Sequence, residues 1–87
     1  MKLTDSATAA ILDVMKKRRL DPKKIAFEFH LLENGGVGIG FSRDKHGTSL
    51  QYGDLTVIIG NGVDMGSTTI DYGEVKGRLG IIFLDNN

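Results

Sequence analysis

Apolar and polar residues alternate along two neighbouring stretches of the chain. Within residues 25–32, apolar side chains occupy every second position from Phe27 to Leu31. Residues 37–41 repeat this pattern, with glycine at the two intervening positions. A period of two is typical of strands with one buried face. The sequence therefore predicts two strands, the second with a bare glycine face that a ligand or another backbone can approach closely.

A helical period precedes these strands. Apolar residues recur three or four positions apart between Ala7 and Met15, and Thr4 is a suitable N-cap. Four basic residues at positions 16–19 complement the negative end of a helix dipole. The pattern predicts an amphipathic helix over residues 5–19, which must end before Pro22 because the residue preceding a proline avoids the α region.

The second half of the chain contains only short strand signals. The almost continuous apolar run within residues 54–59 is typical of a central strand covered on both faces. Residues 67–72 and 81–84 favour two more strands, residues 74–77 a turn, and the polar stretch 42–49 a loop. One helix followed by strands predicts a single α+β domain, mainly β, spanning residues 1–87.

The alternation also predicts which side chains form the core. The strands should contribute one buried face each, and the helix should contribute the face that carries its apolar residues. The expected core consists of Ala7, Ile11, Val14, Met15, Phe27, Phe29, Leu31, Val57, Ile59, Ile70, Ile81 and Phe83.

Composition excludes several kinds of chemistry. The 87 residues include no cysteine, so the chain has no disulfide, no thiolate metal ligand and no cysteine nucleophile. No apolar run is long enough to cross a bilayer and no secretory signal is visible, which predicts a cytoplasmic protein without membrane contact.

The net charge of zero hides an asymmetry. Residues 1–24 hold seven basic and three acidic residues, whereas residues 25–87 hold four basic and eight acidic ones. Such polarity favours head-to-tail contact between two copies. The basic cluster at 16–19 is interpreted as a solvated helix end, with an acidic or RNA partner as the alternative. Because the whole domain is not basic and no aromatic residues are interleaved with the cluster, we expect no nucleic-acid binding.

Few residues are candidates for catalysis or metal binding. His30 and His46 lie near Glu28, Glu33 and Asp44 in the sequence, but nothing in the spacing brings them onto one metal ion. No serine stands in a nucleophile elbow. The glycines of residues 35–40 precede a strand instead of a helix and lack the lysine of a phosphate-binding loop. The sequence therefore predicts no metal site, no cofactor and no enzyme activity.

Taken together, four motifs resemble the HesB-like, A-type iron-sulfur cluster carriers in order and spacing. They are Leu3-Thr4-Asp5-Ser6-Ala7, the loop Asn34-Gly35-Gly36-Val37-Gly38, Thr69-Ile70-Asp71-Tyr72 and Gly80-Ile81-Ile82-Phe83-Leu84-Asp85-Asn86-Asn87. The resemblance covers nearly the whole chain, although the segment Gly60–Gly66 is shorter than in the family. It implies an N-terminal helix packed on a flattened β-sandwich or barrel, assembled as dimers or larger oligomers, with Asp71 as a structural residue.

The chain departs from the family at its cluster ligands. Gly36 occupies the position of the loop cysteine, and the family's Cys-Gly-Cys element would lie beyond Asn87. Iron-sulfur clusters are held by cysteine thiolates, with histidine an occasional substitute. The resemblance therefore implies a scaffold without cluster ligands.

We expect the protein to act through a protein partner, as an accessory module of iron-sulfur assembly and as a homodimer. The candidate interaction loop is Glu33, Asn34, Gly35, Gly36, Val37 and Gly38. Two alternatives stay open. One is an iron or cluster binder that uses His30, His46, carboxylates or a partner's ligands, and the other is a small enzyme with a pocket formed by Glu33, Asp71 and His46.

Overall fold

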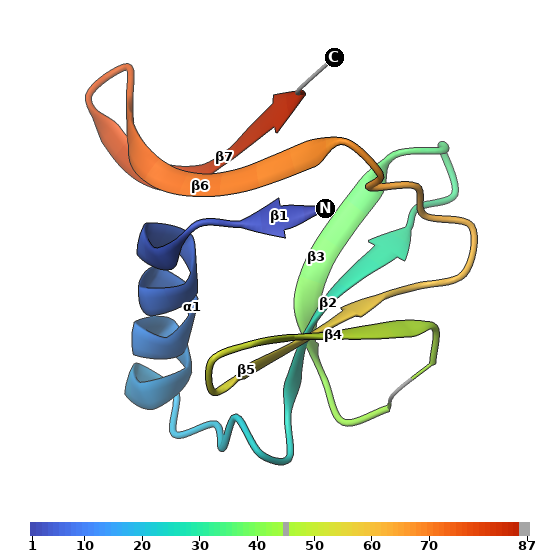
Figure 1. Ribbon diagram of the computed structural model, residues 1–87, viewed down its shortest axis with the longest axis horizontal. Coiled ribbons are helices and arrows are strands. Elements are labelled where there is room, and N and C mark those ends of the chain that lie inside the picture. Colours follow the sequence, from blue (N-terminus) through green and yellow to red (C-terminus); the bar gives the residue numbers. More distant parts are fainter. Residues whose placement is uncertain (45, 86–87) are drawn as a thin grey trace.

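One helix and seven strands make up the part of the chain that the computed structural model describes, residues 1–44 and 46–85 (Figure 1). The elements follow in the order β1 (Lys2–Leu3), α1 (Asp5–Lys17), β2 (Ala26–Leu31), β3 (Val37–Ser42), β4 (Thr48–Tyr52), β5 (Leu55–Ile59), β6 (Thr68–Val75) and β7 (Arg78–Asp85). Asn86 and Asn87 of the closing motif lie outside the described residues. The predicted α+β class, mainly β, with one N-terminal helix is confirmed.

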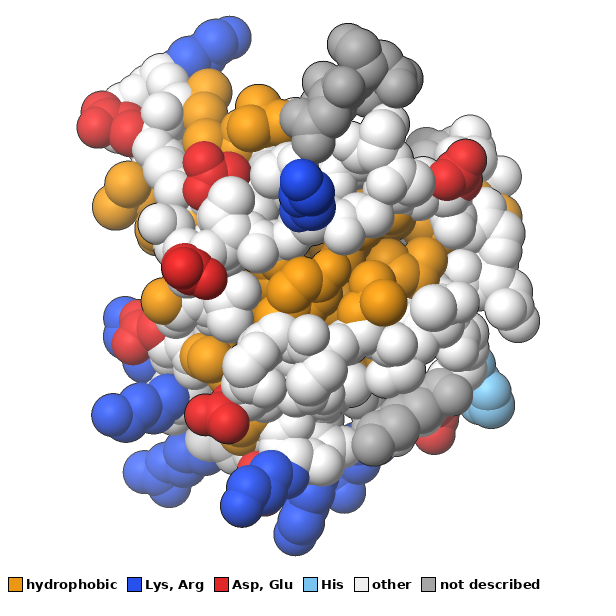
Figure 2. All heavy atoms as spheres, viewed as in Figure 1, with side chains coloured by type: hydrophobic (Ala, Val, Ile, Leu, Met, Phe, Trp, Pro, Cys, Tyr) orange, Lys and Arg blue, Asp and Glu red, His pale blue; other side chains and the backbone are white. Residues whose placement is uncertain are grey.

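The strands form two separate mixed sheets. A four-stranded sheet has the order β3-β2-β5-β4, and a three-stranded sheet has the order β1-β6-β7. Within the described part of the chain the two sheets do not close into a barrel. Apolar side chains are visible in a hollow between β1 and β4 on the face shown in Figure 2.

Helix α1 begins and ends with hydrogen-bonded caps. The Thr4 hydroxyl accepts a hydrogen bond from the Ala7 N–H (3.1 Å), as predicted for an N-cap. At the other end the Leu20 N–H donates to the Met15 carbonyl (2.8 Å), and Arg19 adopts a left-handed conformation with φ 58°. These bonds form a Schellman motif, which ends the helix two residues before the predicted position 19.

The four-stranded sheet is built around β5. This strand pairs in parallel with β2 and antiparallel with β4, and its Leu55, Val57 and Ile58 are fully buried. The prediction of a central strand covered on both faces is confirmed. Strand β3 pairs antiparallel with β2, so that Val37, Ile39 and Phe41 stand opposite Leu31, Phe29 and Phe27.

Two assignments made from the sequence are wrong. Thr48 and Ser49 were expected in a loop, but they begin β4, in which half-buried Leu50 and Tyr52 alternate with exposed Ser49 and Gln51. The turn expected at residues 74–77 is shorter, because β6 continues to Val75 and β7 begins at Arg78. Lys76 and Gly77 alone connect them, with φ 53° and 80°, the two positive values that a type I′ hairpin turn requires.

The core lies between α1 and the two sheets. It contains most of the predicted residues together with Leu3, Leu55 and Met65, while Ile59 and Ile81 are only partly buried. The core prediction is wrong for three residues: the exposed fraction is 40% for Val14, 51% for Leu31 and 50% for Phe83. Leu31 is the last residue of β2, next to the exposed turn, and Phe83 lies on β7 at the edge of the described three-stranded sheet, so strand periodicity alone overestimates their burial.

Candidate functional site

The glycine loop forms a tight turn at the end of the β2–β3 hairpin. The Leu32 N–H donates to the Gly36 carbonyl (2.8 Å), and the Gly35 N–H donates back to the Leu32 carbonyl (3.0 Å). The Asn34 side chain accepts from the Gly36 N–H (2.9 Å), and Gly35 has φ 85°. Side-chain capping and a left-handed glycine therefore hold the turn in one shape.

The predicted bare face of β3 is only half bare. A Cβ atom at Gly38 would overlap the ring of His30, its partner across the strands, so a histidine fills this space. A Cβ atom at Gly40 would meet nothing within 4 Å. Close approach by another molecule is therefore open at Gly40 and blocked at Gly38.

Aliphatic side chains are exposed around this turn. Leu31 is 51% exposed, Leu32 40%, Val37 41% and Ile39 47%. We call these four residues the apolar hairpin end. Leu31 and Val37 are direct partners across the two strands, and Ile39 stands two residues further along the same face of β3. Clusters of exposed apolar side chains are typical of interaction sites.

The residues of the candidate interaction loop lie within or beside the apolar hairpin end. Glu33, Asn34, Gly35 and Val37 are exposed, and Gly36 and Gly38 are half-buried. The predicted loop and the exposed aliphatic residues thus form one surface. Sequence reasoning assigned Leu31 to the core because it continues the alternation of Phe27 and Phe29, and it made no assignment for Leu32.

The titratable residues considered from the sequence do not form a joint site. Among residues 1–44 and 46–85, no group of three His, Cys, Asp or Glu side chains is placed to hold a metal ion. His30 Nδ1 lies 3.7 Å from Glu28 Oε1, and His46 is exposed in the loop before β4. Glu33, Asp71 and His46 belong to separate elements and are not brought together as a metal-binding group.

Asp71 has a structural position. Its Oδ1 accepts hydrogen bonds from the Thr4 hydroxyl (2.7 Å) and from the Tyr72 N–H (2.8 Å). These two hydrogen bonds lower the pKa of Asp71 below its ordinary value, and the bond from the Thr4 hydroxyl contributes more than the bond from the Tyr72 N–H. Because Thr4 is also the N-cap of α1, Asp71 connects the start of the helix to β6.

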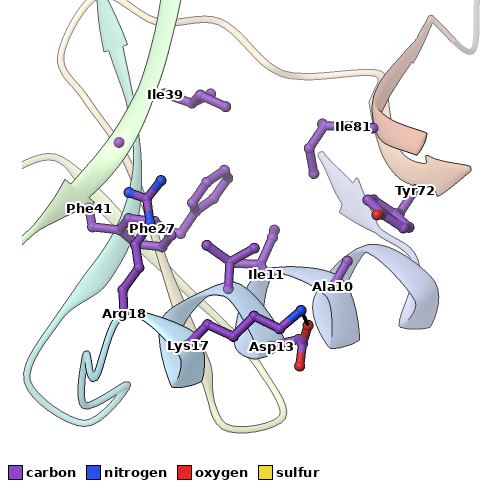
Figure 3. A pocket seen from close by; sticks show the side chains of 13 residues that line it. Ala10, Ile11, Asp13, Lys17, Arg18, Phe27, Ile39, Phe41, Tyr72 and Ile81 are labelled. Carbon is purple, nitrogen blue, oxygen red and sulfur yellow. Dashed lines mark ion pairs between the residues drawn. The ribbon is translucent and has the colours of Figure 1, made fainter. Parts of the chain in front are cut away.

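A second surface feature is a groove of about 540 Å³ that no sequence pattern indicated (Figure 3). It lies between the second half of α1, strand β3 and the β6–β7 hairpin. Ile39 and Ile81 point toward each other across it, and Ile11 and Phe27 form its floor. Arg18 and the Asp13–Lys17 ion pair (2.9 Å) stand at its rim.

Basic side chains gather at the end of α1. On the face shown in Figure 2 they project from the lower left, where Figure 1 places the last turn of the helix and the loop that follows. Lys16, Lys17 and Arg18 are exposed, as expected for a solvated helix end. The hydrogen bond and the charge of Asp13 raise the pKa of Lys17.

Comparison with known proteins identifies no relative. No family model matches the chain, and neither curated proteins nor solved structures yield a match. Within the described residues, no helix is long and apolar enough to cross a membrane.

Proposed function

We propose that this protein is a HesB-like protein-binding module that has no cluster ligands of its own and that serves as a cytoplasmic accessory in iron-sulfur assembly. The observation that carries the proposal is the apolar hairpin end, four large aliphatic side chains that are 40–51% exposed around one ordered turn. The link to iron-sulfur assembly is supported by the four motifs of the resemblance. They fall at the start of α1, in the β2–β3 turn, in β6 and in β7.

Exposed aliphatic residues at this density favour a protein partner. Burying such a cluster removes apolar area from water, which is the main driving force of association. The turn between the strands is held by its own hydrogen bonds, so little conformational freedom is lost when a partner covers it. The hairpin end therefore has the chemistry and the order of a contact site.

A homodimer is part of this proposal. Among the described residues, β3 pairs only with β2 and so forms an edge of the four-stranded sheet. Gly40 leaves open space on this strand, and the basic first quarter of the chain complements the acidic remainder. Edge strands of this kind pair readily with a second copy. Analytical ultracentrifugation at the high protein concentrations used for NMR should show a dimer. A monomer alone at these concentrations would contradict this part of the proposal.

The partner can be identified by site-specific crosslinking, because the chain contains no cysteine and an introduced one is a unique attachment point. A benzophenone label on Gly36→Cys should crosslink in cells to a defined protein, identified by mass spectrometry. The same label on Ser6→Cys, at the exposed start of α1, is the matched control. Adding Val37→Asp to the Gly36→Cys variant should abolish the crosslink, because a carboxylate would have to be desolvated in the contact.

The outcomes of this experiment are distinct. A partner crosslinked equally from both sites, or unaffected by Val37→Asp, would contradict the hairpin end as the contact surface. A specific partner without any part in iron-sulfur assembly would retain the binding module and overturn the accessory role.

A further inference from the structure

We propose that the groove between α1, β3 and the β6–β7 hairpin binds an amphipathic carboxylate, that is, a molecule with an aliphatic body and a single carboxylate group. The inference does not depend on the partner contact proposed above, because the groove and the apolar hairpin end are separate surfaces that share only Ile39.

The size and lining of the groove suit a small apolar body. Its volume of about 540 Å³ falls within the range of about 300–1,000 Å³ that is usual for small-molecule sites. The lining is contributed by α1 and by the strands β2, β3, β6 and β7, and most of its side chains are aliphatic or aromatic. The aliphatic part of a ligand would lie between Ile39 and Ile81 and rest on Ile11 and Phe27 (Figure 3).

Among the described residues that line the groove, Arg18 is the cation available to a ligand. Lys17 already forms an ion pair with Asp13 at 2.9 Å. Arg18 has no ion pair with any described residue, and its guanidinium carbon lies 5.9 Å from the centre of the Phe41 ring. Stacking on an aromatic ring restricts the guanidinium and leaves its N–H groups free. A planar carboxylate is the group that a guanidinium binds through two parallel hydrogen bonds.

Charge and position together define the ligand class. Without Arg18, the groove would favour any aliphatic molecule. Because Arg18, which has no ion pair with a described residue, stands at the rim, the charged group of the ligand stays near solvent while the apolar body is buried. A straight-chain fatty acid of medium length meets both conditions, and decanoate is therefore the probe.

The test compares decanoate with 1-decanol on the complete chain. Backbone amide signals of Gly40 and Gly80, which line the groove from β3 and β7, should shift on addition of either molecule. Titration should show that Arg18→Gln weakens decanoate binding about fivefold, the upper end for an exposed ion pair. The same substitution should leave decanol binding unchanged. Arg19→Gln, one residue away and outside the groove, is the control and should change neither.

A second variant tests the apolar wall. Ala10 is half-buried and points into the groove from α1, so Ala10→Leu should fill part of the volume and weaken both ligands at least tenfold. Ala9→Leu, exposed on the same helix, should have no effect. Leucine is a good helix former, and circular dichroism should show both variants folded. Val37→Asp should bind decanoate as the unmodified chain does, which separates this inference from the proposed function.

Three results would overturn the inference. The first is the absence of saturable shifts at Gly40 and Gly80. The second is an equal loss of decanoate and decanol binding in Arg18→Gln. The third is a change of the Gly80 signal on dilution without ligand, because a second copy of the chain would then cover the β7 side of the groove.

Discussion

At the scale of single residues, one hydrogen-bonded chain connects the helix to the three-stranded sheet. The Asp71 carboxylate accepts from the Thr4 hydroxyl, which in turn accepts from the Ala7 N–H. Because the Thr4 hydroxyl proton is held by the carboxylate, the hydroxyl lone pairs face the N-terminus of α1. Asp71, which belongs to one of the resemblance motifs, is thus explained by its structural contacts without a catalytic role.

Replacing either member of this chain should destabilise the fold. Thr4→Ala should reduce the free energy of unfolding by roughly 0.5–2 kcal/mol, whereas Ser6→Ala in the same helical turn should be close to neutral. The measurement is the urea midpoint of each variant. Equal midpoints for Thr4→Ala and Ser6→Ala would contradict the capping role.

The lowered pKa of Asp71 predicts a dependence on pH. The group stabilises the fold above its unfolded pKa of about 3.9, and this contribution is lost as the pH falls through the lower folded pKa. Asp71→Asn should therefore unfold at lower urea than the unmodified chain near neutral pH. The difference should shrink in strong acid. A difference that is the same in acid and at neutral pH would exclude this linkage.

Two phenylalanines expected in the core should now behave differently. Phe29 is fully buried and Phe83 is 50% exposed, with ring centres 6.3 Å apart. Phe29→Ala should lower the free energy of unfolding by about 3–5 kcal/mol. Phe83→Ala should lower it by roughly 1–2 kcal/mol, because half of the side chain already contacts water. Urea unfolding of the two variants provides the comparison, and losses of equal size would show that Phe83 is covered in solution.

At the scale of secondary-structure elements, the sequence predicted those that have a clear period or cap. The alternation around Phe29 identified β2 and β3, and the apolar run of Val57 and its neighbours identified β5 as central. Strand β4 was missed because Thr48 and Ser49 are polar and exposed, and the alternation of Leu50 and Tyr52 that follows them is too short to predict a strand. Local pattern specifies a strand only when one of its faces is buried.

The end of helix α1 permits a direct stability test. Arg19 has φ 58°, a conformation that costs a residue with a side chain roughly 1–2 kcal/mol. Arg19→Gly should therefore raise the thermal midpoint, although the greater freedom of glycine in the unfolded chain offsets part of the gain. Arg18 has φ −89°, which any residue adopts without strain, so Arg18→Gly should lower the thermal midpoint. A lower midpoint for Arg19→Gly would show that the Arg19 side chain contributes more than its backbone conformation costs.

At the scale of the whole molecule, the candidate surfaces were only partly predictable. The glycine turn was visible as a local motif, and the structure places it beside exposed aliphatic residues. The groove was not visible, because it brings together α1, β3 and β7, and no local pattern encodes the distance between Ile39 and Ile81. Surfaces built from one hairpin are accessible to sequence reasoning, whereas those built between sheets require the fold.

The resemblance to cluster carriers can be tested by restoring the missing thiolates. Gly36 does not adopt a positive φ, and a Cβ atom there would lie 3.0 Å from Asn34 Oδ1, so a small rotation of the Asn34 side chain admits a cysteine. Gly36→Cys with a C-terminal Cys-Gly-Cys tail should bind iron and sulfide anaerobically and develop a visible charge-transfer band. Gly36→Cys alone should bind poorly.

The unmodified chain is the control for this experiment, and we expect no band from it. A stoichiometric band in the unmodified chain would favour the alternative of an iron or cluster binder. A folded double variant without additional iron would show that the loop does not correspond to the family's cluster loop.

The outer edge of β7 has a consequence for the chain while it folds. Within the described sheet β7 pairs only with β6, and its segment from Ile81 to Leu84 is apolar at every position, without proline or charge. Such a segment can stack on copies of itself through both faces, as strands do in amyloid fibrils. Partly folded molecules in which β7 has formed before the rest of the domain has packed are therefore exposed to fibril formation. Rapid folding would protect the protein against it.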